Sequence, residues 1–247
     1  MKTFHYDQII TIDGLTFPIN SMQNSGCCVQ MLEACKGQLD AMLSYHNKVF
    51  VMYFGLHPQE YSPRNEVMSS FVRSIRKSLT CAPNRKPQNA KSYKVQRLGY
   101  AWFREMETVH KHHYHCALMV DGNKVRSTYR IAERVLIPTA NRLNATAYIY
   151  QKPTMVNRKQ LELYKDCLFR ISYGTKERGK GRRSPGANDY STSRIKPNPD
   201  SNWTPFKSEG LLKPWGDSRT RSSSNGDRRS GKGSSEYPQS KIHIYPR

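Results

Sequence analysis

Two histidines separated by one residue begin a hydrophobic stretch near the middle of the chain. His113, Tyr114 and His115 lead directly into the apolar run at residues 116–120, a pattern that is typical of a β-strand. Successive side chains of a strand point to opposite faces, so His113 and His115 project from the same face. Two imidazoles side by side on one face can share a divalent metal ion.

A working metal site needs at least one more ligand, which is usually a carboxylate. Glu105 and Glu107 lie in the strand-like segment 92–108 and share one of its faces. A hairpin through the basic turn 109–112 would pair this segment with the histidine strand, so either glutamate could reach the ion. We predict Glu105 as the third ligand and keep Glu107 as the alternative. Such a mixed nitrogen and oxygen site suits Mn²⁺ or Mg²⁺, although imidazoles also bind zinc.

The histidine run has a second interpretation, in which it is a basic strand end with no ligand role. His110 and His112 show that histidine is abundant at this point without any need to bind metal.

A tyrosine and a lysine three residues apart follow about sixty residues later, at Tyr173 and Lys176. A tyrosine phenol has a pKa near ~10, so it needs a metal ion or a cation nearby to act as a nucleophile at neutral pH. A spacing of three places both residues on adjoining positions of one helical face. The apolar stripe of this predicted helix runs through Leu161, Tyr164, Leu168 and Ile171, and Tyr173 lies off it.

The elements that must position these residues alternate between helices and strands. Apolar spacing predicts helices over 25–46, from Pro63 to about 80, over 126–143 with an interruption at Pro138, and from about 158 onward. Runs of β-branched and aromatic residues predict strands at 48–54, 92–108, 113–120 and 144–151.

Composition indicates a polyanionic partner. The chain has 40 Lys and Arg against 19 Asp and Glu, a formal net charge of +21, which favours nucleic acid or an anionic surface. Nothing approaches a membrane span or a secretory signal, so we expect a cytoplasmic protein with no membrane partner. None of the six cysteines forms a Cys-x-x-Cys pair, and we expect reduced, structural thiols.

Gly, Ser, Pro and Arg become frequent toward the C-terminus, where too little apolar area is available to offset chain entropy. We therefore predict an N-terminal arm at 1–23, one catalytic domain at 24–178 and a basic, largely disordered tail at 179–247. The tail is either dispensable or a non-specific tether to DNA.

The order of three motifs resembles that of HUH-superfamily rolling-circle replication initiators. These motifs are the hydrophobic strand at 49–54, His113-Tyr114-His115 and Tyr173-Gly174-Thr175-Lys176. A closer likeness to the filamentous-phage (inovirus) replication proteins covers about residues 30–195. It is carried by Trp102-Phe103-Arg104-Glu105, the strand at 113–122, and Ser172–Lys176 followed by Tyr190-Ser191-Thr192-Ser193-Arg194.

This resemblance implies an α+β fold, with a central antiparallel sheet flanked by helices and both histidines on a central strand. It implies a metal-dependent endonuclease that nicks single-stranded or hairpin origin DNA in a bacterial host. Tyr173 would attack the phosphate and become covalently linked, Lys176 would support the developing charge, and His113, His115 and Glu105 would hold the metal. The chain has no Gly-x-x-x-x-Gly-Lys-Ser/Thr motif, so we expect a host helicase and polymerase as partners.

Three other functions stay open at this stage. A transposase or mobilisation enzyme would use the same chemistry, and a hydrolytic nuclease would use the metal without Tyr173. A non-catalytic DNA-binding protein would use basic residues and stacked tyrosines, with the histidines purely structural.

Overall fold

The computed structural model describes residues 2–80, 95–108, 111–150, 152–181 and 184–207, and for residues 107, 108 and 111 it describes the backbone alone. The cysteines within these ranges are free and buried, as expected for structural thiols; Cys81 lies outside them.

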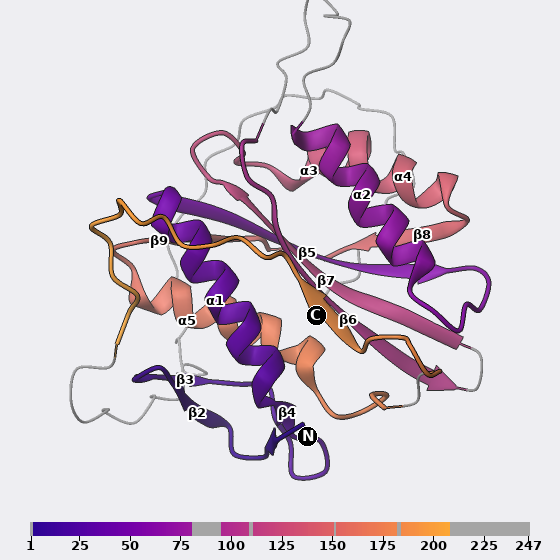
Figure 1. Ribbon diagram of the computed structural model, residues 1–247, viewed down its shortest axis with the longest axis horizontal. Helices are drawn as coiled ribbons and strands as arrows, with labels where there is room; N and C mark the ends of the chain where they lie inside the picture. Colours follow the sequence, from indigo (N-terminus) through magenta and orange to yellow (C-terminus); the bar gives the residue numbers. More distant parts are fainter. Residues whose placement is uncertain (1, 81–94, 109–110, 151, 182–183, 208–247) are drawn as a thin grey trace, which may run out of the picture.

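A six-stranded antiparallel sheet forms the centre of the described fold. Its strands are β5 (Lys48–Pro58), β6 (Gly99–Thr108), β7 (Lys111–Asp121), β8 (Ala145–Ile149), β9 (Thr154–Asn157) and β10 (Tyr190–Thr192). They lie in the order β10, β6, β7, β5, β8, with β9 pairing the first half of β5. The long strands β5, β6 and β7 run diagonally through Figure 1, and this architecture confirms the expected α+β class.

Strand alternation divides the core between the two faces of the sheet. On one face, Val51, Phe103 and Met119 pack beneath α1 (Val29–Tyr45) and α5 (Leu161–Ser172). On the other face, Met52 and Leu118 pack beneath α2 (Glu66–Thr80), α3 (Thr128–Ile131) and α4 (Ile137–Arg142). Figure 1 shows these two groups of helices on either side of the long strands. His113 and His115 therefore face α1 and α5, because they share their strand face with Met119.

The predicted interruption at Pro138 takes the form of a π-helical turn. Residues Ala132–Leu136 form this turn between α3 and α4, and Pro138 follows in the first turn of α4. Proline has no N–H to donate at this position and its ring crowds the preceding turn, so the wider turn lets the helical path continue.

The N-terminal arm extends to Cys28, five residues beyond its predicted end at residue 23, and belongs to the same core. It forms the strands β1 (Phe4–His5), β2 (Ile9–Ile12), β3 (Leu15–Pro18) and β4 (Cys27–Cys28). Ile10, Leu15 and Phe17 are buried in the cluster under α1 and α5. β1 pairs with β4, which leads directly into α1.

The folded part of the chain extends well past residue 178, which corrects the boundary expected for the tail. β10 adds an edge strand to β6, and Ser193 and Ile195 both donate to the Oε1 of Gln38 on α1, at 2.6 and 3.0 Å. Trp203 and Phe206 then pack against the core. Two aromatic residues in an otherwise polar segment are too few to produce a periodic signal. Residues 208–247, the rest of the expected tail, lie outside the described ranges.

Candidate metal centre

Glu105, His113 and His115 come together at the end of the β6–β7 hairpin. Glu105 is the direct register partner of His113 across the hairpin. The Nε2 atom of His115 lies 3.1 Å from that of His113 and 3.0 Å from Oε2 of Glu105. The three ligand atoms all lie within 4.8 Å of one another. The predicted ligand set is thus assembled in space. The side chain of the alternative, Glu107, is outside the described atoms.

The spacing and the charge of this triad fit a divalent ion. Ligands about 2.1 Å from an octahedral ion lie about 3.0 Å from their neighbours in its coordination shell. The donor atom of His115 lies at such distances, 3.1 and 3.0 Å, from those of His113 and Glu105. Burial, helped by His115 and His57, lowers the pKa of His113 to about 3 and keeps its imidazole neutral. Burial alone would raise the pKa of Glu105, but the hydrogen bond and charge of His115 lower it overall. Neutral imidazoles and a carboxylate are the forms that bind metal.

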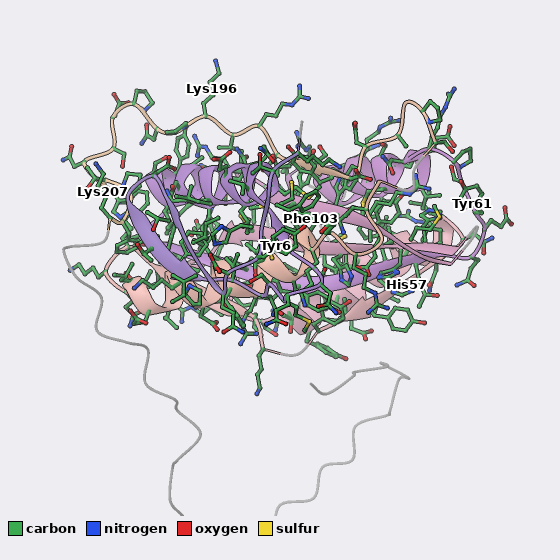
Figure 2. The ribbon with its side chains drawn as sticks, turned by 90° about the horizontal axis from the view of Figure 1, so that it is seen from below. Tyr6, His57, Tyr61, Phe103, Lys196 and Lys207 are labelled. Carbon is green, nitrogen blue, oxygen red and sulfur yellow. The ribbon has the colours of Figure 1, made fainter. Side chains whose placement is uncertain are left out.

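A third histidine, which sequence analysis missed, stacks on the triad. The ring of His57 lies parallel to that of His113 with centroids 4.8 Å apart, and Tyr148 meets His57 edge-on at 4.7 Å. His57 comes from the end of β5, and Figure 2 shows it near one end of the molecule. The sequence pattern predicts that this strand ends at residue 54, whereas β5 continues through Gly55, the register partner of His115, to Pro58. Alternation along these extra residues places His57 on the same face as Gly55.

Tyr173 lies beside the triad. α5 ends at Ser172 and continues as a 3-10 turn over Tyr173–Thr175. The ring of Tyr173 meets that of His115 edge-on, with centroids 5.1 Å apart. The candidate nucleophile and the candidate metal ligands are therefore neighbours in space, although about sixty residues separate them in sequence.

Gly174 makes this approach possible. A Cβ at residue 174 would overlap the ring of Phe103, which lies in the middle of the molecule in Figure 2. Phe103 is in turn the register partner of His115 on β6. Only a glycine lets the turn lie flat against β6, the strand that carries the candidate ligand Glu105.

Lys176 reaches Tyr173 by a different route from the one predicted. The two residues do not share a helical face, because the helix has ended and Lys176 has extended backbone angles. Its Nζ nevertheless lies 4.7 Å from the centroid of the Tyr173 ring. The N-terminal arm holds this segment: Lys176 forms a β-bridge with Cys27, and the N–H of Glu177 donates to the carbonyl of Gly26 at 2.8 Å.

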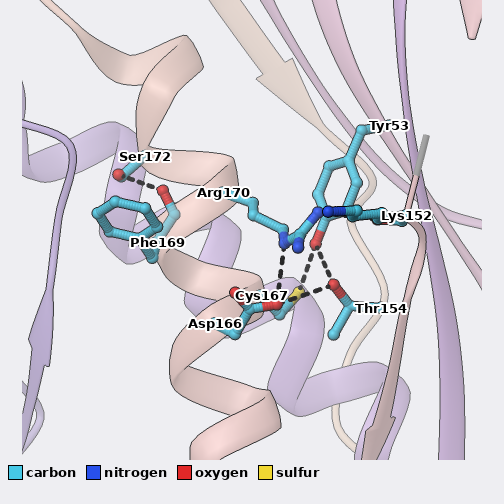
Figure 3. Close-up of polar contacts among 8 residues, drawn as sticks. All are labelled: Tyr53, Lys152, Thr154, Asp166, Cys167, Phe169, Arg170 and Ser172. Atoms are coloured by element: carbon cyan, nitrogen blue, oxygen red, sulfur yellow. Dashed lines mark hydrogen bonds and ion pairs between the residues drawn. The ribbon is translucent and has the colours of Figure 1, made fainter. Parts of the chain in front are cut away.

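Polar contacts fix the end of α5 to the sheet, as Figure 3 shows. The hydroxyl of Tyr53 on β5 lies 3.1 Å from Oγ1 of Thr154 and 3.4 Å from Sγ of Cys167. One helical turn later, Arg170 donates to the carbonyl of Lys152 at 2.8 Å. These contacts hold α5 in place, and the position of α5 determines the position of Tyr173 at its end.

Lys180 is a second lysine at the site, and no sequence signal pointed to it. Gly179 adopts a φ of +72°, and its carbonyl accepts from the N–H of Met106 at 3.1 Å, so the chain turns back along β6. Lys180 therefore lies near Glu105. Its buried Nζ has no hydrogen-bond partner within the described residues. Burial lowers the pKa of Lys180 to about 8, although Glu105 acts in the opposite direction.

The opposite face of the hairpin is braced by a buried arginine. Arg104 donates to the carbonyls of Ser62 and Pro63 at 2.8 and 3.1 Å. The hydroxyl of Tyr114 donates to Asn65 at 3.0 Å. These bonds connect the segment before α2 to the hairpin ends that carry the metal ligands.

A known family model matches part of the chain. Residues 17–136 match the family model of the YagK/YfjJ C-terminal domain. The chain is thus similar to this family over slightly less than half of its length, from within β3 to the π-helical turn. The matched region includes the whole metal triad and ends before Tyr173. No curated protein and no solved structure matches the chain at a significant level.

Within the described residues, no helix is both long and apolar enough to cross a membrane.

Proposed function

We propose that this protein is a metal-dependent endonuclease that nicks single-stranded DNA and becomes covalently attached to it through Tyr173. The observation that carries the proposal is the edge-on contact between Tyr173 and His115 at 5.1 Å. A tyrosine ring this close to the ring of a candidate metal ligand supports attack by its hydroxyl on a phosphate held at the same centre.

The reaction would be a transesterification with no net hydrolysis. The phenol of Tyr173 would release its proton to water as its oxygen forms a bond to the scissile phosphorus, and the bond from phosphorus to the 3′ oxygen would break. The products would be a 5′-phosphotyrosyl link and a 3′ oxygen that takes up a proton to become a free hydroxyl. A polymerase could extend that hydroxyl, and reversal of the step would rejoin the strand.

Glu105, His113 and His115 would hold Mn²⁺ or Mg²⁺, which would orient and polarise the scissile phosphate. Lys176 lies against the ring of Tyr173 and is 8% exposed, so water screens its charge weakly. It would offset the negative charge that develops on the phenolic oxygen and the phosphate. His57 would keep the ring of His113 in place by stacking.

The cellular role we propose is initiation of rolling-circle replication of a phage, prophage or plasmid. The net charge of +21 supports a nucleic acid partner, and the motif order resembles that of such initiators. In this role the protein would bind single-stranded or hairpin origin DNA and depend on a host helicase and polymerase in the bacterial cytoplasm.

A gel assay separates this proposal from its alternatives. Purified protein, Mn²⁺ and labelled single-stranded DNA from the flanks of its own gene would be incubated and then boiled in detergent. A label that migrates with the protein, and that EDTA abolishes, supports a nicking and joining enzyme. Cleavage without an adduct would indicate a hydrolytic nuclease, and binding without cleavage on a range of flanking sequences would favour a non-catalytic binding protein. A transposase or mobilisation enzyme would give the same adduct on DNA from the ends of its element.

A further inference from the structure

A hollow of about 800 Å³ lies next to the candidate metal centre, between the N-terminal arm and the segment that follows Lys176. Its walls are the turn at residues 22–25, with Gln8, and residues 177–180. This volume is within the range of about 300–1,000 Å³ that small-molecule sites occupy.

The lining combines groups that suit a nucleotide. Gln23 and Asn24 are exposed at the tip of the turn, and each amide carries both donors and an acceptor, as the edges of bases do. Met22 is 59% exposed and offers an apolar surface to the face of a base. Arg178 and Lys180 supply positive charge for a phosphate. The hollow also contains the carboxylate of Glu177, which accepts a hydrogen bond from the hydroxyl of Tyr6 at 2.9 Å.

The hollow and the metal centre share a wall. A Cβ at Gly179 would lie 2.5 Å from Cγ of Glu105, so the wall of the hollow touches a predicted metal ligand directly. The N–H of Arg178 donates to Oγ of Ser25 at 3.3 Å, which ties the two walls together. A DNA strand with one phosphate at the triad would therefore pass this wall with an adjacent nucleotide.

Lys180 gives the hollow a specific anion site. Its Nζ is buried and forms no hydrogen bond within the described residues. The carboxylates of Glu105 and Asp189 lie near enough to stabilise its charge, but a buried ammonium without a hydrogen-bond acceptor still lowers stability. A phosphate oxygen would supply that acceptor.

We propose that this hollow binds the nucleotide adjacent to the scissile phosphate, with Gln23 and Asn24 reading its base and Lys180 contacting its phosphate. The inference rests on the proposed function, because it takes single-stranded DNA as the ligand. It adds a site that selects the sequence at which the protein cuts.

The test measures which bases the full chain prefers. The protein is mixed with a pool of single-stranded DNA of randomised sequence, and the bound DNA is sequenced. EDTA is present so that no DNA is cleaved. The wild-type protein should prefer one base at one position by roughly tenfold, and Asn24→Ala or Gln23→Ala should reduce this preference to near uniformity. Asn141→Ala is the matched control, because Asn141 is exposed on α4, on the other side of the sheet from the hollow. It should leave the base preference unchanged.

Lys180→Met tests the phosphate contact separately. It should weaken binding equally for all sequences and reduce the slope of log affinity against log salt by about 0.7. Lys196→Met, at an exposed lysine that points away from the molecule in Figure 2, should leave the slope unchanged.

Base preference and salt slope that stay at wild-type values in Asn24→Ala, Gln23→Ala and Lys180→Met would overturn the inference. Absence of a covalent adduct would contradict the proposed function alone, since these binding measurements do not depend on cleavage.

Discussion

The backbone of Gly174 lies directly against the ring of Phe103, so closely that a single methyl group at Gly174 would overlap it. Phe103 pairs with His115 across the hairpin, and Tyr173 precedes the glycine. This contact therefore connects the end of α5 to β6, which carries the candidate ligand Glu105 and pairs with the histidine strand β7. Because residue 174 has no side chain, the turn can lie close to β6, and this brings Tyr173 to the site.

Gly174→Ala should separate the nucleophile from the metal centre. The new Cβ forces the turn away from β6, so we expect at least a tenfold loss of covalent adduct. Overpacking of this kind should also lower the free energy of unfolding by about 1–3 kcal/mol, measured by urea denaturation. Gly37→Ala is the matched control, because a Cβ at Gly37 on α1 meets nothing within 4 Å. That variant should be more stable by up to about 1 kcal/mol and keep its activity. Wild-type adduct yield in Gly174→Ala would contradict this account of the turn.

Divalent metal should stabilise the protein through the triad. At a Mn²⁺ concentration of 100 times the Kd, binding to the folded state adds about 2.7 kcal/mol, which is visible as a rise in Tm that EDTA reverses. Glu105→Gln and His115→Asn each remove a ligand and should abolish most of this rise. Glu162→Gln changes an exposed carboxylate on α5 and should leave it intact. A rise that persists in Glu105→Gln would place the metal elsewhere.

Acid should destabilise the fold partly through His112. Burial, helped by Arg104, lowers the pKa of His112 to about 4, from an ordinary value of about 6.5 in the unfolded chain. The folded state therefore binds fewer protons than the unfolded state between these values, and stability falls as pH drops from about 6.5 to 4.

His112→Phe should reduce this acid sensitivity. Phenylalanine keeps the ring contacts with Tyr61 and Tyr114 but takes up no proton. Between pH 6.5 and 4 the variant should lose about 2–3 kcal/mol less than the wild-type protein, measured by urea denaturation at each pH. Parallel stability curves for the two proteins would show that His112 does not titrate in this way.

Two truncations should distinguish the packed C-terminal segment from the basic tail. A chain that ends at residue 195 loses Trp203 and Phe206, and the ring of Phe206 packs against Tyr164 at 5.1 Å. It should be about 2–4 kcal/mol less stable than a chain that ends at residue 207. If the tail tethers DNA, the chain ending at 207 should bind DNA more weakly than the full chain and with a smaller salt slope. Equal stability of the two truncations would show that residues 196–207 do not contribute to the core.

Local patterns predicted the metal triad because its geometry follows from strand alternation and one hairpin. Glu105, His113 and His115 needed only a period of two and a short turn to come together. His57 was missed because its strand continues through Gly55 to Pro58, past the run of β-branched and aromatic residues that marks its first part.

Other parts of the site depend on contacts between distant segments, which spacing does not reveal. Lys180 reaches Glu105 only because Gly179 turns the chain back along β6, and Tyr173 reaches His115 only because Gly174 fits against Phe103. Lys176 was predicted to lie beside Tyr173 because residues three apart share a face of a helix. The helix ends before Lys176, and the N-terminal arm instead holds Lys176 beside Tyr173. The tail was predicted to begin too early because Trp203 and Phe206 are isolated aromatic residues.

The most direct test is to identify the residue that carries the DNA. After reaction with single-stranded DNA and Mn²⁺, the protein would be digested with nuclease and protease, and the nucleotide-linked peptide would be sequenced by mass spectrometry. We expect a 5′-phosphonucleotide on Tyr173 and no linked peptide from Tyr173→Phe, which should still bind DNA. A nucleotide on Tyr148, which contacts His57, or an adduct that survives in Tyr173→Phe, would contradict the assignment of Tyr173 as the nucleophile.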